Sequence, residues 1–214
     1  MIRFLLGFLA FWTGFLSLVL SVGLLFFVTT PKVDSIKGCL TTQMRGVYLC
    51  PKSPNYAPMA KISRYVPMAV IASGDGAFYS HRGFDWFELR ASIEKNLEKK
   101  EFARGGSTIT QQLAKNVFLS EEKSVLRKLR EAILTVQMES LLSKNEILEK
   151  YLNIVELGPE VYGVQSASAY YFKKLPAELN LAESVFLAFL LPSPIKYSSS
   201  FRRGEISRFA KEQM

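Results

Sequence analysis

The sequence predicts a mostly α-helical body that follows one N-terminal transmembrane helix. From Phe4 to Val28 no residue carries a charge, and Leu, Phe and Val dominate the run. Beyond about residue 66, apolar residues recur at helical spacing, and several of these segments begin with a helix-capping signal. The sequence contains no internal repeat and no low-complexity tract. We therefore expect a transmembrane anchor (1–30), a linker with short extended pieces (31–65) and a single folded domain (66–214).

The uncharged N-terminal run is long enough to cross a hydrocarbon core of about 30 Å as an α-helix. It is longer than the apolar run of a typical signal peptide, and no small-x-small cleavage site follows it. We therefore expect an uncleaved anchor. Arg3 precedes the run and Lys32 and Lys37 follow it, so the positive-inside rule discriminates poorly. Because the head before the anchor is so short, we expect the body to lie outside the cytoplasm.

The net charge indicates the class of partner, and the two cysteines raise the question of a disulfide. The formal net charge of +8 suits an anionic partner, and the anchor favours lipid headgroups or phosphorylated lipids over nucleic acid. Cys39 and Cys50 bracket a segment that could form a hairpin turning near Arg45-Gly46. Outside the cytoplasm they could form a disulfide, and two free buried thiols are the alternative.

Five helices are expected after the linker, at about 85–100, 107–119, 123–142, 143–153 and 180–191. Three of them begin with capping-box spacing, namely Asp85 with Glu88, Ser143 with Glu146, and Asn180 with Glu183. The expected apolar lines are Trp86, Leu89, Ile93 and Leu97 on the first helix, Ile109, Leu113 and Val117 on the second, and Leu126, Leu129, Ile133 and Val136 on the third.

The helix expected at 107–119 follows a Gly-Gly pair, and Ser107 or Thr108 would be its N-cap. Backbone N–H groups and the positive end of the helix dipole would then face the glycines, which is a suitable anion site. Gln111 and Lys115 are four residues apart and share a face of this helix. The alternative interpretation is an ordinary capped amphipathic helix with a polar outer face.

The next helix concentrates cations around one carboxylate. Arg127 and Lys128 lie four and three residues before Glu131, and Lys123 precedes them. One interpretation is a solvated face with salt bridges. Together with Lys115, the same residues would suit a pyrophosphate, and charge alone does not decide between the two.

His81 is the only histidine, and it lies between an aromatic pair and a glycine. A single histidine without a partner cysteine or second histidine cannot form an ordinary zinc site. The pattern favours a hydrogen-bonded structural residue over a general base.

Taken together, these segments resemble the peptidoglycan glycosyltransferase family, which polymerises lipid II into glycan strands. The motifs that carry the resemblance occur in the family's order and spacing: FYSHRGFD, RGGSTITQQLAKNVFLS, RKLREAI, SKNEILEKYLN and VYGVQSASAYYF. The resemblance covers about Val66–Tyr197. One anchor with one domain is similar to the monofunctional members, the biosynthetic peptidoglycan transglycosylases.

The resemblance implies a lysozyme-like, mostly α fold on the outer face of the bacterial cytoplasmic membrane. Its chemistry is attack of the 4-hydroxyl of lipid II on the anomeric carbon of an undecaprenyl-diphosphate-linked glycan, with inversion, giving a β-1,4 link. A divalent cation (Mg or Mn) or the basic cluster would neutralise the leaving pyrophosphate. No tightly bound cofactor, no protein metal ligand and no nucleic acid are implied, and other cell-wall synthases are candidate partners.

The family's motifs also assign candidate site residues. The catalytic candidates are Glu131, the carboxylate of the third motif, and Asp75, the aspartate of the first. The candidate diphosphate contacts are Lys115, Lys123, Arg127 and Lys128. The residues expected to line the cleft are Ser107, Thr108, Gln111, Gln112 and Asn116.

The first motif departs from the family at one position. The family has Glu-Asp, then Phe, His and Gly at fixed spacing, whereas this chain has Gly74 before Asp75, with Phe78, His81 and Gly83 in place. The missing glutamate is the family's general base, and a positioned base contributes about 10²–10⁴-fold in rate. We therefore expect impaired turnover with substrate binding retained.

Asp75 could replace the missing base only after a backbone rearrangement, which Gly74 and Gly76 would permit. Three hypotheses follow from the sequence. The chain is an inverting glycosyltransferase acting on lipid II, a catalytically impaired relative that binds lipid II or partner synthases as a scaffold, or a glycan-cleaving enzyme on the same architecture. The last needs a second carboxylate across the cleft, and the basic cluster fits it less well.

Overall fold

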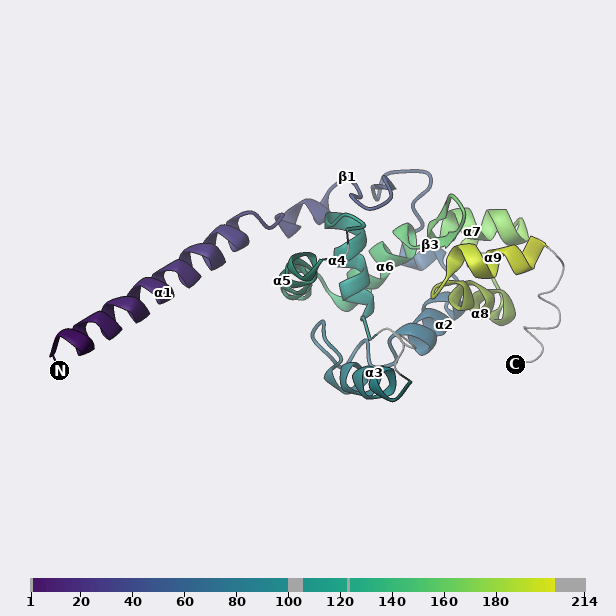
Figure 1. The fold of residues 1–214 in the computed structure, drawn as a ribbon. Coiled ribbons are helices and arrows are strands. Elements are labelled where there is room, and N and C mark those ends of the chain that lie inside the picture. The colour runs from purple at the N-terminus through teal and green to yellow at the C-terminus, as the bar shows by residue number, and fades with distance from the viewer. Residues whose placement is uncertain (1, 100–105, 123, 203–214) are drawn as a thin grey trace. The chain divides into compact units, whose positions relative to one another are not determined.

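The computed structural model describes residues 2–99, 106–122 and 124–202 (Figure 1). The chain divides into two compact units, Met1–Lys32 and Val33–Met214. The first unit is the helix α1 (Ile2–Val28). Its apolar stretch has a mean hydropathy of 2.2, which makes it long and apolar enough to cross a membrane. The predicted N-terminal helix is thus present.

The second unit, the body, is mostly helical. Its helices are α2 (Tyr65–Gly74), α3 (Trp86–Lys99), α4 (Ile109–Phe118), α5 (Val125–Leu141), α6 (Lys144–Ile154), α7 (Gly163–Phe172), α8 (Leu181–Leu190) and α9 (Pro194–Arg202). Its strands are β1 (Leu40–Thr41), β2 (Tyr48–Leu49), β3 (Glu156–Gly158) and β4 (Val161–Tyr162), and they form two antiparallel pairs. Short 3₁₀ turns lie at Val33–Lys37, Met59–Lys61 and Pro176–Glu178. The prediction of a mostly α fold is confirmed.

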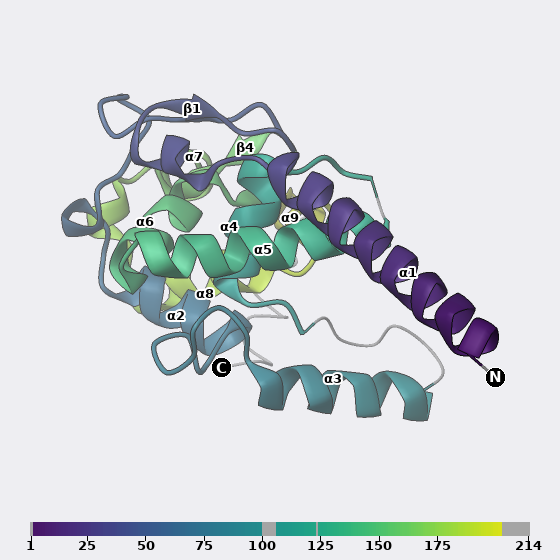
Figure 2. The ribbon, with the colours of Figure 1, turned by 90° about the vertical axis from the view of Figure 1, so that its left-hand side faces the viewer.

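The core of the body lies between α4 and the helices that pack on it. α4 contacts both α5 and α6, and α2 packs along α8. α5 is seen end-on beside α4 in Figure 1 and runs across α4 in Figure 2. The predicted line of Ile109, Leu113 and Val117 on α4 is fully buried in this core. α4 is therefore the element against which the neighbouring helices are placed.

The capping signals correctly mark where helices begin. Ser143 and Asn180 each cap their helix, and the glutamate three residues on accepts a hydrogen bond from the cap residue's own N–H. Asp85 accepts a hydrogen bond from Glu88 N at 2.9 Å. Each bond satisfies an N–H that the first helical turn leaves without a partner.

The segment predicted as a linker contributes to the core. Val33, Ile36, Leu49 and Ala57 are all buried against the body. Two short turns and a hairpin bring these residues inward. Because such segments lack a helical period, the sequence does not indicate that they are buried. Residues 33–62 are thus part of the body, and short extended pieces occur in it as predicted.

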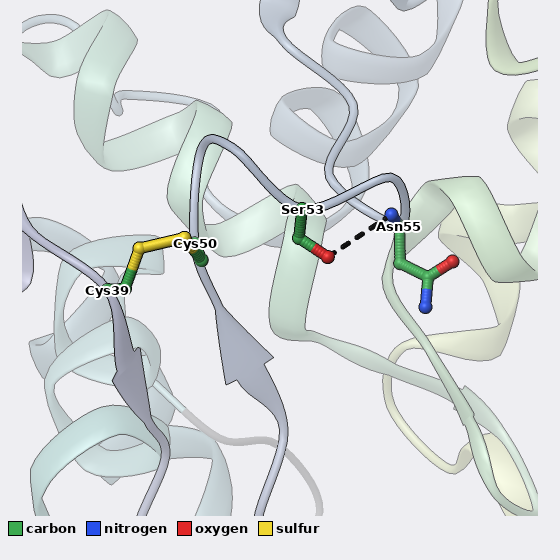
Figure 3. The surroundings of a disulfide bond; sticks show 4 residues. All are labelled: Cys39, Cys50, Ser53 and Asn55. Atoms are coloured by element: carbon green, nitrogen blue, oxygen red, sulfur yellow. Dashed lines mark hydrogen bonds between the residues drawn. A yellow bond between two sulfur atoms is a disulfide. The ribbon is translucent and has the colours of Figure 1, made fainter.

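Cys39 and Cys50 form a disulfide that closes the hairpin of β1 and β2 (Figure 3). The hairpin turns at Gly46, whose φ of +64° lies in the left-handed region that favours glycine. Of the two alternatives that the sequence left open, the structure therefore has the disulfide.

Two of the predicted apolar lines do not face the core. Leu126, Leu129 and Val136 of α5 are exposed, and the residues buried on that helix include Leu134 and Met138. α5 carries apolar residues on two faces, and periodicity does not tell which of them packs.

On α3, Trp86 is 70% exposed and Leu97 is 72% exposed, while the small Ser92 is buried. Gly106 runs so close to this side of α3 that a Cβ added there would lie 3.1 Å from Ser92 Oγ and 3.3 Å from Leu89 Cα. The side of α3 at Ser92 therefore packs against the chain, and its apolar line is exposed. α3 lies at the edge of the body (Figure 2).

Candidate active site

The start of α4 is fixed by its own cap and by the loop that follows α2. Thr108 is the N-cap, with a full capping box to Gln111. The Thr108 hydroxyl also donates a hydrogen bond of 2.7 Å to Gly83 O. Gly83 has a φ of +91°, and a Cβ there would lie 2.7 Å from Thr135 Cγ2 of α5. The loop can therefore reach both helices only with glycine at this position.

The anion site expected at the start of α4 is occupied by a side chain of the same protein. Asp75 Oδ2 accepts a hydrogen bond from Ile109 N at 2.9 Å, and Gln111 N donates to the Thr108 hydroxyl. A carboxylate here complements the positive end of the helix dipole. The anion at this helix start is thus Asp75.

His81 lies beside the same carboxylate. Its Nε2 is 2.8 Å from Asp75 Oδ1, and its Nδ1 accepts a hydrogen bond from Gly83 N at 3.1 Å. Phe78, fully buried, meets the imidazole edge-on. This agrees with the interpretation of His81 as a hydrogen-bonded structural residue.

Glu131 is buried, with 2% of the residue exposed, although it lies on a helix rich in charge. Arg127 Nη1 donates to Glu131 Oε2 at 3.1 Å, and Lys128 Nζ donates to Oε1. Lys128 Nζ also lies 3.3 Å from Ser107 Oγ, across on the segment that leads into α4. A solvated salt-bridged face does not describe this cluster, because its carboxylate is removed from water.

Lys115 of α4 completes the cluster. Burial lowers the pKa of its ammonium group, the charge of Glu131 opposes this effect, and the charges of Arg127, Lys128 and Arg45 add to it. The charges of these α5 residues therefore act on Lys115. Within the described residues its Nζ has neither a hydrogen bond nor an ion pair.

Most of the remaining predicted residues lie on or beside α4. Gln112 joins Ser107 O at 3.3 Å to the hydroxyl of Tyr151, which donates to Gln112 Oε1 at 2.9 Å. Asn116 accepts a hydrogen bond at its carbonyl from Met44 N. Lys123 lies outside the described residues. The structure thus joins Arg127, Lys128 and Ser107 to Glu131, whereas Asn116 lies in the last turn of α4, away from the start of that helix.

Gly74 ends α2, directly before Asp75. A Cβ added at Gly74 would have no atom within 4 Å, and its φ is not in the positive region. A larger side chain could therefore be placed here without backbone strain.

Two residues of this region were not singled out from the sequence. Arg45, at the tip of the disulfide hairpin, forms ion pairs with Glu121 and Glu156 and adds positive charge near Lys115. Tyr151 is fully buried beneath α4. The sequence around Arg45 has no pattern that indicates which residues it contacts. Tyr151 lies on an apolar helix face, where the sequence does not distinguish it from other core residues.

The described residues do not form a protein-held site for a divalent cation. They contain no group of three or more His, Cys, Asp or Glu side chains that could hold a metal ion. Both oxygens of Glu131 are engaged by cations, and hard divalent cations prefer free carboxylate oxygens.

Comparison with known proteins decides the family. The family model described as Transglycosylase matches residues 43–213, which is most of the chain. The chain belongs to the transglycosylase family. The resemblance noted in the motifs is confirmed, and the body has the lysozyme-like, mostly α fold class of transglycosylases.

Curated relatives agree with this assignment. Proteins named biosynthetic peptidoglycan transglycosylase from Chromobacterium violaceum and Aromatoleum aromaticum are 46% and 44% identical over 142 and 146 residues. These alignments cover 66% and 68% of this chain, and 62% and 64% of the two relatives. A relative of the same name from Acinetobacter baylyi is 46% identical over 151 residues, 71% of this chain. The chain thus spans somewhat less than two thirds of the first two transglycosylases.

Proposed function

We propose that the chain is a membrane-anchored glycosyltransferase of cell-wall synthesis whose substrates are lipid II and an undecaprenyl-diphosphate-linked glycan. The observation that carries the proposal is a half-buried cation cluster with unused donors. Lys115 Nζ has no partner, and Arg127 Nε is buried without one, among the described residues. Buried donors of this kind lose hydration without compensation unless an anion binds. A diphosphate supplies several acceptor oxygens and the matching charge.

The proposed reaction is an inverting displacement. The 4-hydroxyl of one lipid II attacks the anomeric carbon of the glycan on the second lipid, and the bond from that carbon to the diphosphate breaks. The negative charge that develops on the leaving diphosphate is stabilised by Lys115, Arg127 and Lys128. Glu131 holds Arg127 and Lys128 in place through its two oxygens. Inversion at the anomeric carbon gives the β-1,4 link.

The hydroxyl proton must pass to a base. By the resemblance of the first motif, Gly74 stands where the family has its glutamate. Glu131 forms ion pairs with two cations, and the buried Asp75 carboxylate is hydrogen-bonded to His81 and Ile109. We therefore propose slow polymerisation with retained lipid II binding.

Replacing Gly74 by glutamate tests this proposal. A Cβ at Gly74 meets no atom within 4 Å and the backbone there does not have a positive φ, so the restored base in Gly74→Glu should raise lipid II polymerisation about 100-fold or more. The measurement is glycan chain formation from purified lipid II in detergent. Gly74→Ala is the matched control, because it adds a Cβ without a carboxylate, and it should polymerise as slowly as the wild type.

Equal rates for the wild type and Gly74→Glu would show that the base lies elsewhere. If neither variant polymerised while both bound lipid II, the evidence would favour the second candidate function. In that function the chain binds lipid II or partner synthases as a scaffold, and the observation behind it is the empty space beside Gly74.

A further inference from the structure

We propose that Asp75 is a positioning residue, which fixes the start of α4 and the orientation of His81, and that it does not act as the missing base. Its effect on substrate binding rests on the proposed function, whereas its effect on His81 does not. The inference follows from the accessibility of the carboxylate, the proton on the imidazole and the helix that the carboxylate holds.

The Asp75 carboxylate is closed to substrate. Only 1% of its side chain is exposed. Oδ1 is bonded to His81 Nε2 and Oδ2 to Ile109 N, at 2.8 Å and 2.9 Å. A general base must come within hydrogen-bond reach of the proton that it removes. Asp75 would have to leave both partners before a sugar hydroxyl could reach it.

The hydrogen bonds around His81 assign its proton. A backbone N–H only donates, so Gly83 N must donate to a bare Nδ1 of His81. In neutral His81 the proton therefore sits on Nε2, and it is donated to Asp75 Oδ1. The pair is thus an imidazole oriented by a carboxylate, with the carboxylate as acceptor.

The same carboxylate acts on α4 through Ile109. Ile109 N belongs to the first turn, where helical N–H groups lack partners in the helix, and Asp75 supplies one together with a negative charge. This helix carries Gln112 and Lys115 of the candidate site. Asp75 thereby joins the end of α2, the loop to Gly83 and the start of α4.

A second contact extends this arrangement to Gln112. Burial raises the pKa of the Tyr151 phenol well above its usual range, and the charge of Asp75 raises it further. Tyr151 therefore keeps its proton and donates it to Gln112 Oε1 at 2.9 Å. Tyr151 thus holds the Gln112 side chain of α4 from the α6 side.

The test uses the full chain in detergent with isotope-labelled histidine, since His81 gives the only imidazole signals. In the wild type, nitrogen NMR should show neutral imidazole with the proton on Nε2. In Asp75→Asn the amide can still accept from Nε2, but its NH₂ group cannot accept from Ile109 N. We expect a shifted His81 signal, and lipid II binding weakened roughly 3- to 30-fold, the range of a helix-terminus charge.

Asp85→Asn is the matched control. Asp85 accepts from a first-turn N–H of α3, as Asp75 does for α4, but it does not contact His81. This variant should change neither the His81 signal nor lipid II binding. Asp75→Asn keeps the side-chain volume, so the test does not depend on opening a cavity at this buried position.

The outcomes separate the two proposals. An unchanged His81 signal and unchanged lipid II binding in Asp75→Asn, with loss of the remaining polymerisation, would identify Asp75 as a base and overturn the inference. A wild type that does not bind lipid II would reject the proposed function, while the His81 signal would still test the position of Asp75.

Discussion

Among the cations of the candidate site that the structure describes, Lys115 is the one that the protein itself stabilises least. Burial lowers the pKa of its ammonium group, and no described residue forms an ion pair with it. A buried charge without a partner lowers the free energy of unfolding, and the binding of an anion offsets this cost. The residue is therefore better explained by ligand binding than by stability.

Lys115→Met separates these two roles, because methionine keeps the unbranched apolar stem, one atom shorter, and removes the charge. We expect lipid II binding to weaken about tenfold or more, the value of a charge-assisted contact, without a fall in the thermal midpoint. Fluorescent lipid II titration and thermal unfolding measure the two effects. Lys61→Met, at an exposed lysine, should change neither. A lower midpoint with unchanged binding would assign Lys115 to the fold.

The lowered pKa of Lys115 also sets the sign of a pH dependence. The folded chain releases this proton at a lower pH than the unfolded chain does. Between the lowered pKa and the ordinary value of 10.5 the unfolded state binds more protons, so stability rises with pH in this window. A bound diphosphate favours the charged form, so lipid II binding should weaken over the same window, and Lys115→Met should lose that part of the dependence.

At the scale of elements, the disulfide hairpin supports the far end of the helix that carries Lys115. Gln43 N donates to Val117 O at 2.9 Å, and Met44 N donates to Asn116 O at 3.3 Å. These carbonyls lie in the last turn of α4, where partners within the helix are lacking. α4 is thus held at its start by Asp75 and at its end by the hairpin.

Removing the disulfide should loosen the end of α4. For Cys39→Ser with Cys50→Ser we expect a loss of about 2–3 kcal/mol in unfolding free energy, typical of a short closed loop. Urea unfolding measures this loss, and hydrogen exchange should be faster at Gln43 and Met44 than in the wild type. Reducing the wild type should reproduce both changes, and reducing the double variant should add nothing. Unchanged exchange at these amides would mean that the hairpin stays docked without its cross-link.

The sequence predicts the ends of elements better than the faces that they bury. Ser143 and Asn180 mark helix starts because their hydrogen bonds are local. On α5 the buried face carries Glu131 and Thr135, so the hydrophobic pattern pointed to the opposite side. Polar residues occupy this face because the candidate site lies there, which is where local pattern and function are expected to disagree.

The role of Asp75 could not be predicted from the sequence for a different reason. Motif spacing places Asp75 beside a missing base, but its partner Ile109 is far along the chain, and only the fold brings the two together. In contrast, the interpretation of His81 came from its local sequence, because no cysteine or second histidine lies beside it to complete a zinc site.

At the scale of the whole molecule, the chain combines an apolar helix with a body that has its own core. The body begins at Val33, and buried residues from its first turn, Val33 and Ile36, pack into that core. Little chain separates α1 from the folded body, so an anchor in α1 would keep the body close to a membrane surface. Under the proposed function, a lipid-linked substrate would then be available without leaving the bilayer.

The side of the membrane on which the body lies is the last prediction. Charges before and after α1 discriminate poorly, but the disulfide of Cys39 and Cys50 follows the helix directly, and disulfides persist in oxidising compartments. We therefore expect the body outside the cytoplasm. In cells denatured before labelling, because Cys50 is buried, a thiol-reactive mass tag should label these cysteines only after reduction, and Cys39→Ser should make Cys50 label without reduction.

A reporter fused after Met214 gives an independent measurement of the same orientation. An enzyme that folds only outside the cytoplasm should be active in this fusion, and one that works only in the cytoplasm should be silent. Activity of the cytoplasmic reporter, together with labelling of both cysteines before reduction, would place the body inside. Lipid II polymerisation at the outer face would then be excluded for this chain, because an apolar helix of this length holds its body on one side of the bilayer.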